Sequence, residues 1–335
     1  MNRKVRILSI DGGGIRGIIP AVILNCIEKG LQRKSGDPYV TLADFFDLVA
    51  GTSTGGILTC YYLLPPLPGN KCHSRYFAAE AIDMYARHGK EIFSHEFLRC
   101  GWFREKYDVS GLKKVLIDCM GDTTLAQATK NCLITAYDIT NRRAVLFTSP
   151  EAKLHEHRNY LMRDIARATS AAPTYFELAA IQSMVGTNSY LIDGGVYAGN
   201  PTLCAIVEAN KSVFDGCANP EVNDLFIVSV GTGNEKKKYD YNKAQNWGAI
   251  GWMRPVLDIL LSASAEVVHY QIKNLFKVAG CSDYYQRLEP ELGEAKPEMD
   301  DVSDDNIRQL INSGESFIQN NTEKLETIID CLISL

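Results

Sequence analysis

The chain has 335 residues, of which 46% are hydrophobic and 22% charged, and it carries a formal net charge of −5 at pH 7. This is ordinary globular composition, so a disordered, collagen-like or coiled-coil protein is excluded as a description of the whole chain. A protein that binds nucleic-acid phosphates needs a basic excess, so the acidic balance argues against a nucleic-acid partner.

The first 64 residues predict two strand-to-helix units. Val5–Ile10 and Phe45–Ala50 are short apolar runs, and both are predicted to be buried strands. Ile18–Lys34 has apolar residues at helical spacing, and Gly55–Leu64 is a predicted helix that ends at two prolines.

Helices and strands continue to alternate up to residue 230. The predicted helices are Ala78–His88, Val109–Cys119, Tyr160–Ala171 and Pro201–Asn210, and the predicted strands are Asn131–Ile139, Ala144–Phe147, Tyr190–Ile192 and Leu225–Val230. This alternation predicts an α/β fold of three layers, with a mostly parallel central sheet and helices on both faces.

The last part of the chain is predicted to be helical. Gly248–Ala279 is one long helix, an acidic loop follows at 289–305, and residues 305–335 are helical with an interruption at Gly314. No linker and no repeat separates this part from the rest. We expect residues 1–335 to form a single domain, with an α/β core at about 5–235 and a helical part at about 248–335 packed on it.

The cysteines and the N-terminus bear on the compartment. The ten cysteines include no Cys-x-x-Cys pair, and several of them, such as Cys26 and Cys60, stand in apolar stretches, as is typical of free buried thiols. The first apolar run is too short for a signal-peptide core, and no stretch of 18 apolar residues occurs. We therefore expect a cytoplasmic protein that contacts a membrane at most transiently.

The most informative segment is Gly51-Thr52-Ser53-Thr54-Gly55, which follows a predicted strand and precedes a predicted helix. This is the context that a Gly-x-Ser-x-Gly nucleophile elbow requires. The small flanking residues relieve crowding at the sharp turn, and the helix N-terminus favours negative charge near the Ser53 hydroxyl. The same residues could instead form a glycine-rich turn with an N-capping serine.

A second segment, Asp11-Gly12-Gly13-Gly14-Ile15-Arg16-Gly17, also lies between a strand and a helix. Successive glycines let backbone N–H groups point into one concavity. Such a loop could hold a phosphate or form the oxyanion hole of an acyl-transfer enzyme. It is not a Walker A loop, because no Gly-Lys-Ser/Thr follows.

A third segment, Tyr190-Leu191-Ile192-Asp193-Gly194-Gly195, places a carboxylate at the end of a strand. Parallel strands present their carboxyl ends at one edge of a sheet, so the glycine loop, Ser53 and Asp193 can meet in one crevice. A solvated turn aspartate is the alternative.

Together the three segments resemble the patatin-like phospholipases, which carry a glycine-rich oxyanion loop, a Gly-x-Ser-x-Gly elbow and an Asp-Gly-Gly/Ala box in this order. Thr169–Phe176 and Asn200-Pro201-Thr202 are similar to the family's stretches before and after the aspartate. The resemblance covers at least residues 5–235, and the terminal helices are similar to those of stand-alone bacterial members.

The resemblance implies a Ser–Asp dyad. Ser53 is then the nucleophile and Asp193 the base, with the N–H groups of Gly12, Gly13 and Gly14 forming the oxyanion hole. Arg16 would bind a substrate phosphate or support the loop, unless it is an ordinary surface arginine at a helix start. The elbow and box glycines are Gly51, Gly55, Gly194 and Gly195.

A conventional triad would need a histidine after Asp193, and His269 is the only one. It stands inside a predicted helix rather than a loop, which favours a structural role. Asp300, Asp301, Asp304 and Asp305 do not have the spacing of an EF-hand loop, so no metal is expected. Residues 247–261, with Trp247, Trp252, Met253, Leu257, Leu260 and Leu261, could lie on lipid as an interfacial helix, although core packing is the favoured interpretation.

The sequence therefore predicts a calcium-independent lipid acyl hydrolase that cleaves glycerolipid esters through an acyl-serine intermediate, with a lipid substrate at a membrane surface and no cofactor. Two alternatives stay open. A catalytically silent storage or binding protein would keep the fold, and a nucleotide-binding protein would use the glycine loop.

Overall fold

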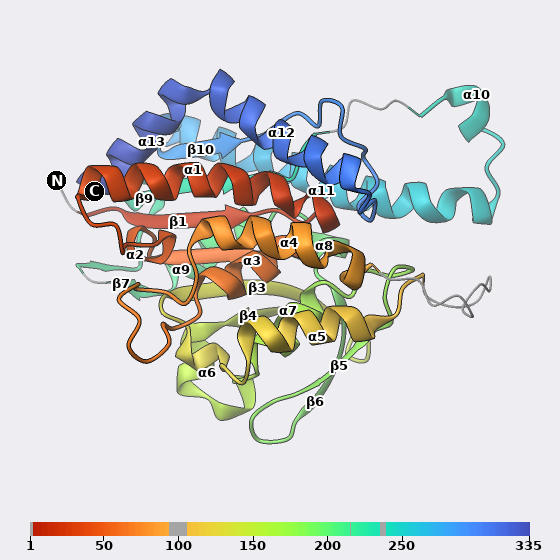
Figure 1. Cartoon of the computed structure of the whole chain (residues 1–335), viewed down its shortest axis with the longest axis horizontal. Coiled ribbons are helices and arrows are strands. Elements are labelled where there is room, and N and C mark those ends of the chain that lie inside the picture. The colour runs from red at the N-terminus through yellow and green to blue at the C-terminus, as the bar shows by residue number, and fades with distance from the viewer. Residues whose placement is uncertain (1–2, 94–105, 215, 235–238) are drawn as a thin grey trace.

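The computed structural model describes residues 3–93, 106–214, 216–234 and 239–335 (Figure 1), without the side chains of residues 243, 249, 250, 253, 254, 257, 258 and 261. In this part of the chain eight strands form one sheet, in the order β10-β9-β1-β2-β3-β6-β5, with β4 paired to β3. These strands are β1 (Val5–Ile10), β2 (Leu48–Gly51), β3 (Asn131–Asp138), β4 (Arg143–Thr148), β5 (Ala179–Gln182), β6 (Asn188–Asp193), β9 (Leu225–Val230) and β10 (Tyr285–Leu288). A separate two-stranded ribbon joins β7 (Val213–Phe214) to β8 (Cys217–Ala218).

The sheet is mostly parallel, as the sequence predicts. Strands β10, β9, β1, β2 and β3 pair in parallel, whereas β4 and β6 run antiparallel to β3, and β5 runs antiparallel to β6. The four central strands are fully buried or nearly so, because helices cover both faces.

One face of the sheet shares a large apolar cluster with α1, α3, α4, α5, α7, α12 and α13. In Figure 1, α1, α12 and α13 lie together along one side of the sheet, with α4 and α5 in front. The bounds are α1 (Ile18–Ser35), α3 (Thr54–Tyr62), α4 (Ala78–Ile92), α5 (Val109–Met120), α7 (Met162–Thr169), α12 (Asp304–Asn320) and α13 (Thr322–Ser334), with the short α2 (Leu42–Phe45), α6 (Ser149–Leu154) and α10 (Tyr241–Ala244).

The opposite face packs on α8 (Gly195–Ala198), α9 (Thr202–Asn210) and α11 (Ala249–Val278). A second, smaller apolar cluster forms there. It joins Ile7 and Ile227 of the central strands to Ile206 of α9 and to Ile272 and Phe276 of α11. The chain therefore has the three layers that the alternation of strands and helices predicts.

The C-terminal part differs from the purely helical prediction in two respects. Tyr285–Leu288 forms β10, which extends the sheet beside β9. Four residues are too few for a clear alternating pattern, which is why the sequence does not reveal this strand. The last helical stretch is interrupted at Asn321 rather than at Gly314. A Cβ at Gly314 would collide with Val22, so this glycine lets α12 lie close against α1.

The prediction also differs from the structure in other elements. Phe45 ends α2, so β2 begins only at Leu48. The helix predicted over Tyr160–Ala171 is shorter and begins at Met162. Strand β5 is absent from the sequence prediction, since it is short and half exposed.

The nine cysteines that the structure describes are free thiols. Among the described helices, none combines the length and the apolar character that a membrane span requires.

Candidate active site

Ser53 stands on a sharp turn between β2 and α3. Its backbone has φ 54° and ψ −123°, a conformation that residues other than glycine rarely adopt. The first turn of α3 follows directly. The turn needs glycine on both sides: a Cβ at Gly51 would collide with the Gly55 carbonyl, and one at Gly55 with the Ile10 carbonyl. The structure thus forms the strained elbow that the Gly-x-Ser-x-Gly pattern predicts.

The elbow is held from a second element. The Ser53 N–H donates to the Thr169 hydroxyl oxygen at 2.9 Å, at the end of α7. The adjacent Thr52 hydroxyl lies 2.7 Å from that of Thr135 and 2.6 Å from the Ala198 carbonyl oxygen. These bonds hold the elbow on both sides of the Ser53 Cα before any substrate binds.

Asp193 reaches Ser53 by a route that the sequence does not show. Gly51, at the end of β2, pairs with Ile134, and Asp193, at the end of β6, pairs with Ala136. Strand β4 occupies the other edge of β3, so β2 and β6 lie along the same edge and run toward each other. Their carboxyl ends meet because β6 is antiparallel, and not because all strands end at one edge.

The Asp193 carboxylate is buried, with only 3% of the residue exposed. Its Oδ1 accepts a hydrogen bond from the Gly195 N–H at 2.7 Å. Burial raises the pKa of Asp193 to about 7, against the lowering effect of hydrogen bonds from the Ser53 side chain and the Gly195 N–H. An aspartate with this pKa is a far better base at neutral pH than an exposed one.

The glycine loop lies beside Ser53. Gly12 faces the Ser53 side chain, but its N–H donates to the Gly199 carbonyl oxygen at 2.9 Å. Gly13 and Gly14 line the pocket together with Ser53, and the described hydrogen bonds use neither of their N–H groups. The N–H groups of Gly13 and Gly14 therefore have no partner among the described hydrogen bonds, whereas the resemblance implies an oxyanion role for all three glycines.

Contacts with distant segments keep the loop in place. Gly14 has φ +60°, and a Cβ there would collide with the Met299 carbonyl, while one at Gly13 would collide with Thr232. The Thr232 hydroxyl donates to the Gly12 carbonyl oxygen at 2.7 Å. The same Met299 carbonyl accepts the Ile15 N–H at 2.8 Å.

Arg16 is placed for the support of this loop. Its Nε donates to the Gly13 carbonyl oxygen at 3.4 Å, and Arg16 does not belong to the lining of the pocket that contains Ser53. Of the two roles that the resemblance implies for Arg16, this hydrogen bond corresponds to contact with the loop.

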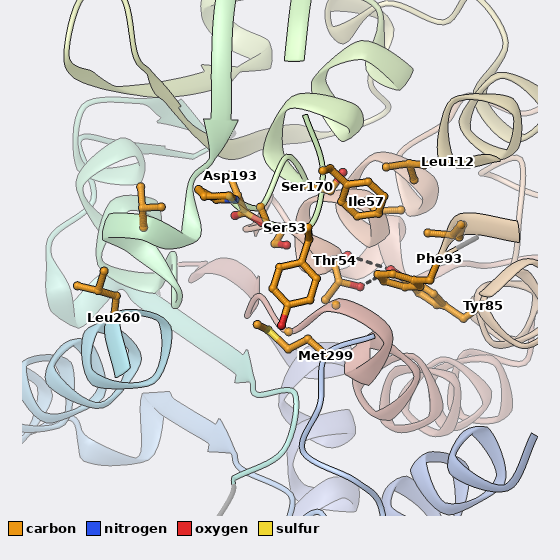
Figure 2. A pocket seen from close by; sticks show the side chains of 18 residues that line it. Ser53, Thr54, Ile57, Tyr85, Phe93, Leu112, Ser170, Asp193, Leu260 and Met299 are labelled. Atoms are coloured by element: carbon orange, nitrogen blue, oxygen red, sulfur yellow. Dashed lines mark hydrogen bonds between the residues drawn. The ribbon is translucent and has the colours of Figure 1, made fainter. Parts of the chain in front are cut away.

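The pocket around Ser53 and Asp193 encloses about 830 Å³ of space between atoms, a figure that includes open solvent at its mouth. Figure 2 shows Asp193 and Leu260 on one side of Ser53, and Tyr85, Phe93 and Leu112 on the other. The walls are mainly apolar and aromatic, contributed by Ile57, Tyr85, Ile92, Phe93, Leu112, Tyr175, Phe176, Val196, Leu260 and Met299. A site of this shape fits a hydrocarbon chain next to a reactive ester.

His269 does not belong to the lining of this pocket. It lies in α11, half-buried, and its Nδ1 is 3.0 Å from the Tyr285 hydroxyl. Burial and the positive charge of Arg287 lower its pKa. The other described histidines do not line the pocket either, and His95 falls outside the described residues.

The four aspartates between residues 300 and 305 are engaged with cations. Lys106 binds Asp300, Lys296 binds Asp301, Lys90 binds Asp304 and Arg308 binds Asp305. Asp300 also accepts the Tyr107 hydroxyl at 2.6 Å.

Sequence reasoning missed a buried ion pair under the glycine loop. Arg287 of β10 donates to Asp11 at 2.6 Å and, through Nη1, to the Ser229 hydroxyl at 2.9 Å. Its Nε donates to Glu289 at 2.8 Å. Burial raises the pKa of Asp11 to about 6, although Arg287 pulls it down. Asp11 is part of the loop motif, but no local signal points to its partner 276 residues away.

Comparisons with known proteins identify the family. Residues 8–206, more than half of the chain, match the family model described as patatin-like phospholipase. Patatin-like protein 2 of Oryza sativa subsp. indica is 35% identical over 97% of this chain and 86% of its own length. Patatin group J-1 of Solanum tuberosum is 33% identical, with the same coverage of both chains. The chain belongs to the patatin-like phospholipase family.

As a patatin-like phospholipase, the chain falls in a class of enzymes that hydrolyse acyl esters of lipids. The relatives above are plant proteins, so the narrower expectation of a bacterial-type member gains no support from them. Among solved structures, VipD from Legionella pneumophila matches 95% of this chain and 67% of its own, with a TM-score of 0.38 and 13% identity.

Proposed function

We propose that this patatin-like phospholipase is a phospholipase A-type hydrolase that uses a Ser53–Asp193 dyad and needs no calcium. The observation that carries the proposal is the meeting of β2 and β6 along one edge of β3, which brings a strained serine to a buried carboxylate. The pKa of about 7 at Asp193 fits the role of a base at neutral pH.

In the acylation step the Ser53 Oγ attacks the ester carbonyl carbon while its proton passes to Asp193. The negative charge that develops on the carbonyl oxygen is stabilised by the N–H groups of Gly13 and Gly14 and by the N-terminus of α3. The tetrahedral intermediate then expels the alcohol, the lysolipid, which takes the proton from Asp193. The fatty acyl group remains on Ser53.

In the deacylation step a water molecule attacks the acyl-Ser53 carbonyl. Asp193 takes a proton from this water, and the same two N–H groups hold the oxyanion. Collapse of the second intermediate releases the fatty acid and returns the proton to Ser53. In each half-reaction Asp193 accepts one proton and then gives it back, so no further acid or base is required.

The apolar pocket supports an acyl chain as the group that binds deepest. Its aromatic side contains Phe93 and Tyr85, and burial raises the pKa of Tyr85 so that its hydroxyl stays neutral. A nucleotide-binding role has less support, because the Gly12 N–H already donates to the Gly199 carbonyl oxygen. In addition, no described lysine or arginine lines the pocket. A catalytically silent storage role would not explain why Ser53 is held in a strained backbone conformation.

Two further features of the proposal rest on side-chain partners. The acidic residues from Asp300 to Asp305 already bind lysine or arginine, which supports catalysis without calcium. The free cysteines support a reducing, cytoplasmic location.

The test is lipid mass spectrometry after incubation of the pure protein with phosphatidylcholine vesicles. Wild type should release fatty acid and lysophosphatidylcholine in equal amounts, and Ser53→Ala should be slower by roughly 10³-fold or more. Ser170→Ala is the matched control, since the Ser170 hydroxyl lines the same pocket but donates to the Ala166 carbonyl oxygen at 2.7 Å. Product formation by Ser53→Ala, or release of the head group instead of a fatty acid, would contradict the proposal.

A further inference from the structure

Helix α11 is only partly packed against the body of the protein. Near its C-terminal end Ile272 and Phe276 are fully buried in the apolar cluster behind the sheet. Its N-terminal part extends beyond the sheet, and α10 lies at its far end (Figure 1). Among the described residues, this part of α11 presents mostly exposed side chains.

An apolar stripe runs along the exposed side of this helix. At 100° per residue its members fall within an arc of about 100°. They are Trp252, Val256, Ile259, Leu260, Ala263, Val267 and Tyr270, and all seven are exposed. Val256 is 40% exposed and Val267 is 53% exposed. The seven side chains of the stripe carry no charge, and the charged Glu266 lies beside the stripe. We call these seven residues the α11 stripe.

Aromatic side chains stand at the outer end of the stripe. The rings of Trp247 and Trp252 pack edge to face, with their centroids 5.1 Å apart. The rings of Tyr239 and Trp247 pack in the same way, with their centroids 5.4 Å apart. Tyr239 and Trp252 are both more than two-fifths exposed. Tryptophan and tyrosine are the residues that favour the boundary between lipid and water, where one end of the ring is apolar and the other is hydrated.

The stripe is continuous with the catalytic pocket. Leu260 lines the pocket that contains Ser53 and Asp193, and 44% of this residue is exposed. Figure 2 shows Leu260 on α11, on the same side of the pocket as Asp193. An acyl chain that leaves a bilayer beneath α11 thus meets the pocket rim directly. A protein partner seated on the stripe would cover this rim and hinder the substrate.

We propose that the α11 stripe docks on the surface of a zwitterionic phospholipid bilayer and presents the pocket rim to the lipid. The inference rests on the proposed function, since it assumes that the pocket takes an acyl chain. Apolar burial drives the docking, because a chain of net charge −5 gains no overall attraction from an anionic membrane.

The experiment measures binding to sucrose-loaded phosphatidylcholine vesicles in a Ser53→Ala background, which keeps the vesicles intact. The double variant Val256→Gln/Val267→Gln adds polar groups to the stripe without touching the pocket lining. Its partition coefficient should fall by about tenfold or more. Val207→Gln is the matched control, because Val207 is a helical valine, 60% exposed, on α9. This control should bind like the parent protein.

Hydrolysis assays separate this inference from the proposed function. With Ser53 restored, the double variant should lose activity on vesicles by a similar factor and hydrolyse a soluble p-nitrophenyl ester at the wild-type rate. Equal vesicle binding by the double variant and its parent would overturn the docking surface. If the wild-type chain formed a dimer and the double variant did not, the docking surface would also be overturned, because the stripe would then be an interface between copies. Failure of wild type on the soluble ester would instead overturn the proposed function.

Discussion

Arg287 donates to Asp11 at 2.6 Å, so the last strand of the sheet is tied by a buried ion pair to the first residue of the glycine loop. Both side chains are less than one-tenth exposed. One Asp11 oxygen, Oδ1, is buried with no hydrogen-bond partner among the described residues, which makes this carboxylate depend on Arg287. The pair therefore links the stability of the fold to the shape of the oxyanion loop.

Removal of this guanidinium should destabilise the protein strongly. Arg287→Met leaves Asp11 and Glu289 without their cation, and breaking a buried pair costs about 3–5 kcal/mol of unfolding free energy. Urea denaturation measures the loss. Arg308→Met is the control, because Arg308 pairs with Asp305 on the surface and both side chains are more than two-thirds exposed. A similar small loss in both variants would show that the buried pair has no special weight.

Gly14 should be needed for catalysis and not only for the turn. A Cβ there would collide with the Met299 carbonyl and shift the Gly14 N–H, so Gly14→Ala should lower kcat on a soluble ester by about 10²-fold or more. Gly36→Ala is the matched control, since Gly36 also has a positive φ but lies in open space at the end of α1. It should lose stability through backbone strain and keep its kcat. Equal kcat values for both variants would remove Gly14 from the oxyanion hole.

The pH dependence of kcat/KM should follow Asp193. This carboxyl is a base only when ionised, so activity on a soluble ester should rise about tenfold per pH unit below pH 7 and level off above it. Glu28→Gln is the control, because burial raises the pKa of Glu28 to about 7 as well, and Glu28 does not belong to the pocket lining. If Glu28→Gln shifted the pH profile of kcat/KM, the rise below pH 7 would belong to a structural group and not to Asp193.

The same pKa predicts a change in stability. The folded-state pKa of Asp193 lies above its unfolded value of 3.8, so the native state binds this proton more tightly. Its contribution is complete below about pH 4 and is lost as the pH rises through 7. Asp193→Asn does not titrate, so its unfolding free energy relative to wild type should increase from pH 5 to pH 8. A constant difference across this range would contradict the raised pKa.

Chelation should leave the activity intact. The acidic residues from Asp300 to Asp305 already have lysine or arginine partners, and the described residues contain no group of three metal-binding side chains. Hydrolysis of phosphatidylcholine vesicles with and without EDTA measures this. Lost activity that calcium restores would refute the calcium-independent mechanism.

The local motifs could be recognised from the sequence because each of them is contiguous. The elbow at Ser53, the glycine loop and the box at Asp193 all carry small residues that a sharp turn or a close approach demands. The partners of these motifs could not be recognised, because they come from far along the chain. Arg287 and Met299 support the glycine loop from the C-terminal part of the chain, and nothing in their own neighbourhoods marks them.

The way in which Asp193 reaches Ser53 was also beyond the sequence. Strand β6 pairs with β3 through only three residues and runs against it, and no periodicity encodes that choice of partner or direction. The Gly12 N–H illustrates the same limit, since its bond to Gly199 depends on how α8 packs. Residues 247–261 are expected to pack in the core, whereas Trp252, Val256, Ile259 and Leu260 are exposed and Trp247 is half-buried. Met253, Leu257 and Leu261, whose side chains lie outside the described residues, leave that prediction untested there.

The central claim is that Asp193, and no histidine, is the base that activates Ser53. Its most direct test is hydrolysis of a soluble p-nitrophenyl ester by Asp193→Asn and by His269→Ala, with circular dichroism to confirm that both fold. Asp193→Asn keeps the shape but cannot take a proton, so it should lose roughly 10³-fold or more of kcat/KM. His269→Ala should stay within a few-fold of wild type, because His269 contacts Tyr285 and does not line the pocket. A folded but inactive His269→Ala, or an active Asp193→Asn, would contradict the account.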